Sequence, residues 1–201
     1  MNIIKHEFFS EQELVERMRQ VTMLKSPQTR VYEQAFISLE KISTDFMAPP
    51  QNYILRQELK KVRELKWALE KRGINLFELQ GFVRITLEGH SEPVDVLPPV
   101  VEESIEQNGS IHLIINDGMH RVYMARREWT IPQVVLIRGV PKNLPYYAYP
   151  TPDGWSGVEE RDDLPPGYLK KWHRIENYHS LYRNFNSAFI NVGGPREFFK
   201  N

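Results

Sequence analysis

The stretch Leu113-Ile114-Ile115-Asn116-Asp117-Gly118-Met119-His120-Arg121 joins a short apolar run to an Asn-Asp-Gly turn and a His-Arg pair. The residues that follow, 122–127, read as a helix, so the pattern predicts a strand, a tight turn and a helix start. A helix N-terminus has unpaired N–H groups and about half a positive charge, which suit a phosphate. An Arg and a His beside it donate charge-assisted hydrogen bonds to anionic oxygens. We therefore expect a phosphate site at this turn.

The side chains of the turn have distinct expected roles, each with a simpler structural alternative. His120 binds phosphate or acts as a general acid or base, and otherwise bonds to backbone. Asp117 holds Mg²⁺ or orients its neighbours, and otherwise only caps the helix. Arg121 pairs with phosphate oxygens, and otherwise with a local carboxylate. The expected phosphate or nucleotide contacts are Asn116, Gly118, Met119 and Arg121, with Gly118 allowing close backbone approach or a positive φ.

Composition narrows the class of protein. The 201 residues are 41% hydrophobic, which is enough for a real core and argues against global disorder. Lys and Arg together equal Asp and Glu at 26 each, whereas dedicated nucleic-acid binders usually carry a basic surplus. The chain has no cysteine, so it has no disulfide, thiolate nucleophile or cysteine zinc site. It shows no signal peptide and no apolar run long enough to span a bilayer. We expect a cytoplasmic protein without membrane contact.

The spacing of apolar residues and the positions of turn-forming and capping residues predict the remaining helices and strands. Ser10 to Glu13 has the form of a capping box and should start a helix of about four turns. A strand is expected over 35–42, and a long helix over 52–72, capped by Asn52 and followed by Gly73. Further strands are expected over 82–87, 94–97 and 132–137, and a short helix over 101–105. The long helix carries seven Lys or Arg against three Glu. This basic face is the best argument for nucleic acid, although a solvated charged face has the same pattern.

The amino-acid composition of the chain changes near residue 145. The last 57 residues hold 12 of the 23 aromatics, and disordered tails are poor in aromatics. We predict three parts: an N-terminal helical segment over 1–35, a core domain over 36–144, and an extension over 145–201 packed on the core. The extension also carries a polar cluster among its aromatics. His179, Arg183 and Arg196 are its candidate substrate contacts, and His179 and Arg183 are four residues apart, so on a helix they would share a face. The alternative is a packed cap whose polar groups satisfy one another.

The order of elements around Asp117-Gly118-Met119-His120-Arg121 resembles the ParB/sulfiredoxin-like superfamily over roughly residues 36–140. The five residues are similar to the family's Asp-Gly-x-His-Arg signature. The resemblance implies an α+β fold, a small mixed sheet with helices. It also implies a nucleotide of the ATP or ADP class as ligand, with Mg²⁺ as its companion ion. Sulfiredoxins need a cysteine that this chain lacks, and partition proteins usually have a glutamate in the motif and a following helix-turn-helix that are absent here.

Within the superfamily the motif is nearest to that of the free-serine-kinase-like branch, with Met119 in place of that branch's first histidine. That branch uses a base in the loop after the first strand, which here offers Asp45, with Glu40 in the strand before it. The predicted function is binding of a nucleotide or phosphorylated small molecule, with phosphoryl transfer or nucleotide hydrolysis catalysed by His120, Asp117 and Asp45. The alternatives are a DNA-associated or nuclease-type ParB-like module and a regulator that binds its ligand without turnover. The oligomeric state is left open.

Overall fold

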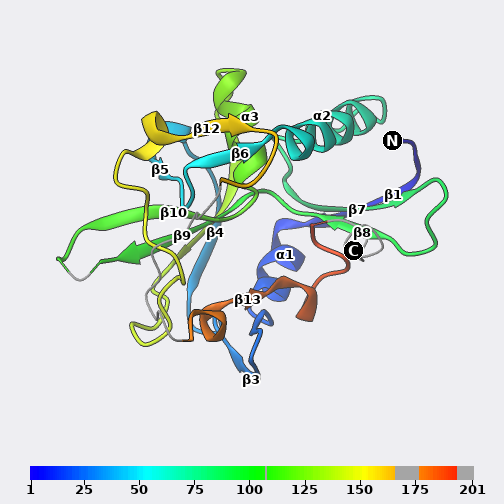
Figure 1. The fold of residues 1–201 in the computed structure, drawn as a ribbon. Coiled ribbons are helices and arrows are strands. Elements are labelled where there is room, and N and C mark those ends of the chain that lie inside the picture. The colour runs from blue at the N-terminus through cyan, green and yellow to red at the C-terminus, as the bar shows by residue number, and fades with distance from the viewer. Residues whose placement is uncertain (107, 166–176, 194–201) are drawn as a thin grey trace.

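The computed structural model describes residues 1–106, 108–165 and 177–193 (Figure 1). Its α-helices are α1 (Glu11–Met18), α2 (Arg56–Glu70) and α3 (Met119–Arg127). Its strands up to α3 are β1 (Ile3–Ser10), β2 (Thr22–Met23), β3 (Ser26–Arg30), β4 (Phe36–Lys41), β5 (Met47–Ala48), β6 (Tyr53–Leu55), β7 (Gly81–Leu87), β8 (Val94–Val96), β9 (Val100–Ile105) and β10 (Ile111–Asp117). The later strands are β11 (Gln133–Arg138), β12 (Glu159–Arg161) and β13 (Arg183–Asn184). This mixed architecture confirms the predicted α+β class.

A five-stranded mixed sheet, in the order β4-β11-β9-β10-β5, forms the centre of the molecule. Alternate residues of β11 enter two different apolar clusters, Val134 and Leu136 on one face and Val135 and Ile137 on the other. Side chains of α2 and α3 belong to the first cluster and those of α1 to the second. The sheet is therefore covered by α2 and α3 on one face and by α1 on the other (Figure 1).

The predicted short helix over 101–105 is wrong, because these residues lie in strand β9. β9 pairs antiparallel with β10 and parallel with β11, so it is held from both sides within the sheet. Its first two residues, Val100 and Val101, are completely buried. Valine favours a pleated, buried strand, and pairing on two sides outweighs the weak helical pattern of Glu102 to Ile105.

The N-terminal segment is less helical than predicted. The capping box is confirmed, since the Ser10 hydroxyl accepts the Glu13 N–H and the Glu13 carboxylate accepts the Ser10 N–H. However, α1 has only eight residues, because residues 22–23 pair with β3 and β13 instead of continuing the helix. Strand β1 precedes it and pairs with β7 in a second sheet of order β1-β7-β8.

Helix α2 is shorter than predicted and starts differently. Residues 53–55 form strand β6, which pairs with β12, so Asn52 is not the cap. The N-cap is Leu55, which has no side-chain capping hydrogen bond. Beyond the other end Gly73 has φ +73°, as expected of a glycine that ends a helix. No helix in the described residues is both long and apolar enough to cross a membrane.

The described part of the C-terminal segment packs on the core throughout. Leu181 and Phe189 join the apolar cluster on the α1 face, and Tyr146 and Ala148 pack against Ile114 of β10. Strands β12 and β13 pair with β6 and β2. Residues 145–165 and 177–193 are thus tied into the molecule by both backbone pairing and apolar contacts.

Candidate functional site

The Asp-Gly turn between β10 and α3 is closely built around Gly118. Gly118 has φ +86°, a left-handed conformation that favours glycine. A Cβ on this residue would also lie 2.8 Å from Nη2 of Arg121. Two separate reasons therefore favour glycine at this position: the left-handed backbone conformation, and the close packing of the Arg121 guanidinium against it.

Arg121 holds this turn together. Its Nη2 donates to Oδ2 of Asp117 at 2.5 Å, and its Nη1 donates to the carbonyl of Leu97 just beyond β8. The side chain is only 13% exposed. Arg121 thus pairs with a local carboxylate, which is the structural alternative to a phosphate contact. A ligand at this turn would have to share the guanidinium group with Asp117. Since Asp117 pairs with a cation of the chain, its proposed role as a Mg²⁺ ligand draws no support from this arrangement.

His120 links the first turn of α3 to the start of α2. Its Nε2 accepts a hydrogen bond from the Leu55 N–H at 3.2 Å, so the ring is neutral and carries its proton on Nδ1. Burial lowers the pKa of His120, an effect that the nearby charge of Glu58 opposes and that of Lys61 assists. Nδ1 has no hydrogen-bond partner within the described residues. A half-buried donor is thus available for a ligand.

The N-termini of α2 and α3 meet at this histidine. Neither the N-cap of α2, Leu55, nor that of α3, Gly118, makes a side-chain capping bond. A helix that begins in this way keeps free N–H groups and partial positive charge at its first turn. His120 lies in the first turn of α3 and contacts the N-cap of α2. Two uncapped helix starts therefore adjoin one neutral imidazole.

One of the comparisons with known proteins gives a match that contains this turn. Residues 13–159, about three quarters of the chain, match the ParB CE domain family. The chain belongs to this family. This confirms the ParB/sulfiredoxin-like resemblance. No curated protein and no solved structure matches the chain.

In this ParB CE domain, the region matched to the family extends beyond the predicted core domain of 36–144 in both directions. It begins inside α1 and ends at the first residue of β12. The turn and both helix N-termini lie well within it.

Two residues of the motif point away from the turn. Met119 is 8% exposed and packs in the apolar cluster beneath α2 and α3, so only its backbone is available to a ligand. The Asn116 amide donates to the Tyr32 hydroxyl at 2.8 Å and to Glu102 at 3.0 Å. The expectation that these two side chains contact phosphate is therefore corrected, since both are used by the interior of the protein.

Arg183 is also part of the interior, not a substrate contact. Its Nε and Nη2 donate to the two oxygens of Glu102, and its remaining donors reach the carbonyls of Leu144, Pro145 and Leu181. All five guanidinium hydrogens are used. Burial is the largest single effect and lowers the pKa of Arg183, but the charges and hydrogen bonds of Glu102 and Tyr32 together outweigh it and raise that pKa. The buried partner Glu102 was not predicted, and its one signal in the sequence is that it directly follows the apolar pair Val100-Val101.

The other predicted site residues do not gather at the turn. Asp45 is 70% exposed and pairs with Arg126 in the last turn of α3, whereas His120 is in the first turn. The proposed base makes no hydrogen bond or ion pair with His120 or Asp117 in the described residues. Glu40 accepts from Ser38 and Arg138. His179 is exposed and packs against Tyr178 and Tyr182.

His179 and Arg183 do not lie on one helix, which is the condition under which their spacing of four would put them on one face. A 3-10 helix covers Tyr178–Leu181, and Arg183 lies in β13, so the two residues do not follow helical spacing. Arg196 lies outside the described residues. Within the described part of the chain, no group of three or more His, Asp or Glu side chains is arranged to hold a metal ion.

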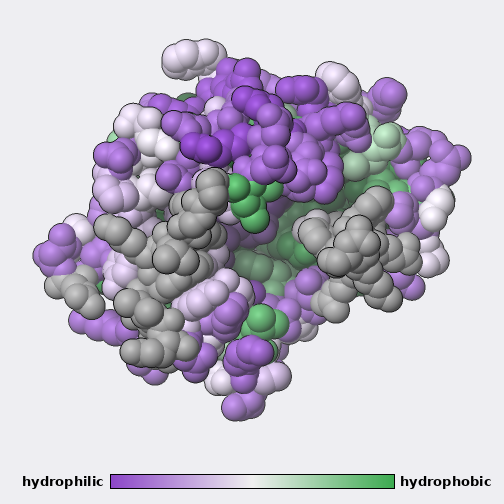
Figure 2. All heavy atoms as spheres, viewed as in Figure 1, coloured by the Kyte–Doolittle hydropathy of each residue, from purple (hydrophilic) through white to green (hydrophobic). Residues whose placement is uncertain are grey.

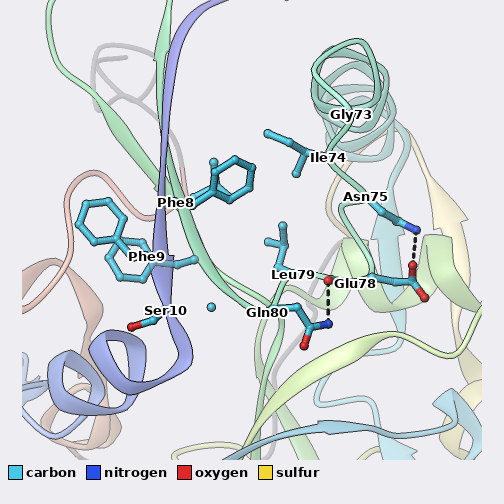
Figure 3. A pocket seen from close by; sticks show the side chains of 12 residues that line it. Phe8, Phe9, Ser10, Gly73, Ile74, Asn75, Glu78, Leu79 and Gln80 are labelled. Carbon is cyan, nitrogen blue, oxygen red and sulfur yellow. Dashed lines mark hydrogen bonds between the residues drawn. The ribbon is translucent and has the colours of Figure 1, made fainter.

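Two surface hollows lie away from the turn. One of about 470 Å³ separates β1 from the loop after α2, where Phe8, Ile74 and Leu79 point toward one another (Figure 3). The other, about 670 Å³, is bordered by Phe46, Ile111 and Trp155. Figure 2 shows the contrast between an apolar hollow below α2 and the hydrophilic surface over α2 and α3. The first hollow lacks charged side chains except Glu78, so it does not resemble a phosphate site.

Proposed function

We propose that this ParB CE domain binds the phosphate groups of a nucleotide, or of another phosphorylated small molecule, between the N-termini of α2 and α3. The observation that carries the proposal is the meeting of two uncapped helix starts at His120. Phosphate oxygens would accept from the free N–H groups of both helices and from Nδ1 of His120. Gly118 and Arg121 shape the turn, while His120 makes the direct side-chain contact.

Charge explains why an anion fits here better than a neutral ligand. The imidazole is neutral in the free protein because burial lowers its pKa. A bound phosphate would accept the Nδ1 proton that the neutral ring already carries, while Nε2 keeps its hydrogen bond from the Leu55 N–H. Phosphoryl transfer or hydrolysis would be a further property of the same site. Two carboxylates lie near His120: Asp117, which pairs with Arg121, and Glu58 in the first turn of α2, which pairs with Lys61.

The test is calorimetric titration of the full chain with ATP, ADP, CTP, GTP and inorganic phosphate, with and without Mg²⁺. His120→Asn should weaken binding at least tenfold, and His179→Asn should leave it unchanged because His179 is exposed elsewhere. Failure of every ligand to bind, or equal binding by His120→Asn and wild type, would refute the proposal. Phosphate release in the same samples measures turnover.

Arg121→Ala is the less suitable variant, although the motif makes it the obvious one. Arg121 bonds to Asp117 and to the Leu97 carbonyl, so its removal should lower stability as well as affinity.

A DNA-associated function is the second candidate, and one surface favours it. On α2, Trp67 is 55% exposed and lies one helical turn from both Arg63 and Lys71. Neither cation has a partner among the described residues, whereas Arg56, Lys61 and Lys66 form ion pairs. An aromatic between two cations can stack on a base while the cations contact phosphates. Binding to single- and double-stranded DNA at two salt concentrations tests this. No binding at low salt excludes it.

A further inference from the structure

A carboxylate of the chain occupies a cationic pocket next to the proposed phosphate site. Oε1 of Glu160, in β12, accepts from the Tyr123 hydroxyl at 3.1 Å and from Nη1 of Arg127 at 2.5 Å. Its Oε2 lies 3.8 Å from Nε of Arg56. The Glu160 side chain is only 24% exposed. Donors from two helices therefore surround one anion.

The cationic groups around Glu160 need an anion. Arg56 is the first residue of α2, where the helix dipole disfavours positive charge. It is held there by Asp162 at 2.6 Å as well as by Glu160. Arg127 comes from the last turn of α3 and reaches the same carboxylate. Two guanidinium groups that converge in this way repel each other unless a negative group lies between them.

This pocket adjoins His120. On α3, Tyr123 follows His120 by three residues, a spacing that puts both on one face of the helix. In the β6–β12 ladder, Glu160 pairs with Ile54, next to Leu55, whose N–H bonds to His120. Figure 1 shows β12 beside β6 where α2 begins. One ligand with two linked anionic groups can therefore span both positions.

We propose that Arg56, Tyr123 and Arg127 form a second phosphate subsite, which Glu160 fills in the free protein, and that the ligand carries two linked phosphates, as a nucleoside diphosphate or triphosphate does. This inference rests on the proposed function at His120. A phosphate group carries more charge than a carboxylate and has three acceptor oxygens, so it replaces Glu160 at these donors. Because a ligand with two linked phosphates must displace Glu160, this carboxylate lowers the affinity for such a ligand and leaves the affinity for a single phosphate unchanged.

The experiment titrates the full chain with inorganic orthophosphate and with pyrophosphate. Glu160→Gln removes the competing charge and keeps an oxygen for Tyr123. It should bind pyrophosphate about tenfold more tightly than wild type, which equals about 1.4 kcal/mol. Its affinity for orthophosphate should change less than twofold. Glu159→Gln is the matched control, because Glu159 is 66% exposed and pairs with Arg161 at 2.6 Å. It should behave as wild type.

A second variant guards against misfolding of Glu160→Gln. Arg127→Gln in the wild-type background should weaken pyrophosphate binding at least threefold and leave orthophosphate binding unchanged. Equal effects on both anions, or no gain in Glu160→Gln, would overturn the second subsite. If His120→Asn still weakens both anions in that case, the proposed function stands. If neither anion nor any nucleotide binds any form, the proposed function fails and the second subsite fails with it.

Discussion

Arg183 and Glu102 lie 81 residues apart in the chain and form an ion pair whose side chains are 0% and 1% exposed. The pair joins β13 to β9 at the centre of the sheet. The Tyr32 hydroxyl and the Asn116 amide bond to the same carboxylate, at 3.0 Å each. Burial, followed by the charge of Glu102, raises the pKa of Tyr32. The network connects the C-terminal segment with the residue that precedes the Asp-Gly turn.

Removing one partner of this pair should be costly. Arg183→Met leaves Glu102 buried and uncompensated, and we expect a loss of about 3–5 kcal/mol in the free energy of unfolding. Urea denaturation measures it. The exposed pair of Lys41 and Glu78 is the control, since Lys41→Met should cost less than about 1 kcal/mol. Adding Glu102→Leu to Arg183→Met should recover part of the loss. A loss no larger than that of the control would show that the pair is not desolvated.

Gly118→Ala tests the double requirement at the turn. A non-glycine residue at this φ costs about 1–2 kcal/mol, and the new Cβ would also meet the Arg121 guanidinium. Gly89→Ala is the matched control, because Gly89 has φ +79° and open space around it. The difference in unfolding free energy between the two variants isolates the contact with Arg121. Equal losses would mean that Arg121 moves aside freely.

Stability should fall toward acid pH through His120. The pKa of this residue is lower in the folded chain, mainly because of burial, than its value of about 6.5 in the unfolded chain. Below about pH 6.5 the unfolded state therefore binds more protons, and the stability present above that pH is lost as the pH falls through the folded pKa. Urea midpoints at pH 7.5 and 5.5 measure this loss. His120→Asn should reduce it, whereas an undiminished acid loss in that variant would assign the effect elsewhere.

Trp129→Gly should stabilise the protein. Trp129 has φ +53° just after α3, where glycine is the usual residue, and its side chain is 96% exposed. Glycine relieves the left-handed backbone at little loss of packing, so we expect a gain of about 1 kcal/mol. Thermal denaturation measures it. Trp129→Ala keeps the strain and serves as control. A loss of stability in Trp129→Gly would show that the indole contributes contacts of its own.

The elements that the sequence predicts well are those whose signals are local. The capping box at Ser10, the glycine after α2 and the strand–Gly118–helix turn all depend on residues within one or two turns of each other. The strand β9 was missed because its pairing with β10 and β11 is remote in the chain. Helix α2 starts late for the same reason, since its first residues are drawn into pairing with β12.

The residues of the candidate site show the same difference between local signals and long-range contacts. The sequence by itself determined that Asp117, Gly118, His120 and Arg121 lie at one turn, because a turn and a helix start are set by neighbouring residues. Only the tertiary structure decided what those side chains touch. It brought Leu55 to His120 and Leu97 to Arg121, and it placed Glu160 between Arg56 and Arg127. It also buried Arg183 against Glu102. Such contacts depend on strand pairing and packing between distant segments, which local composition does not record.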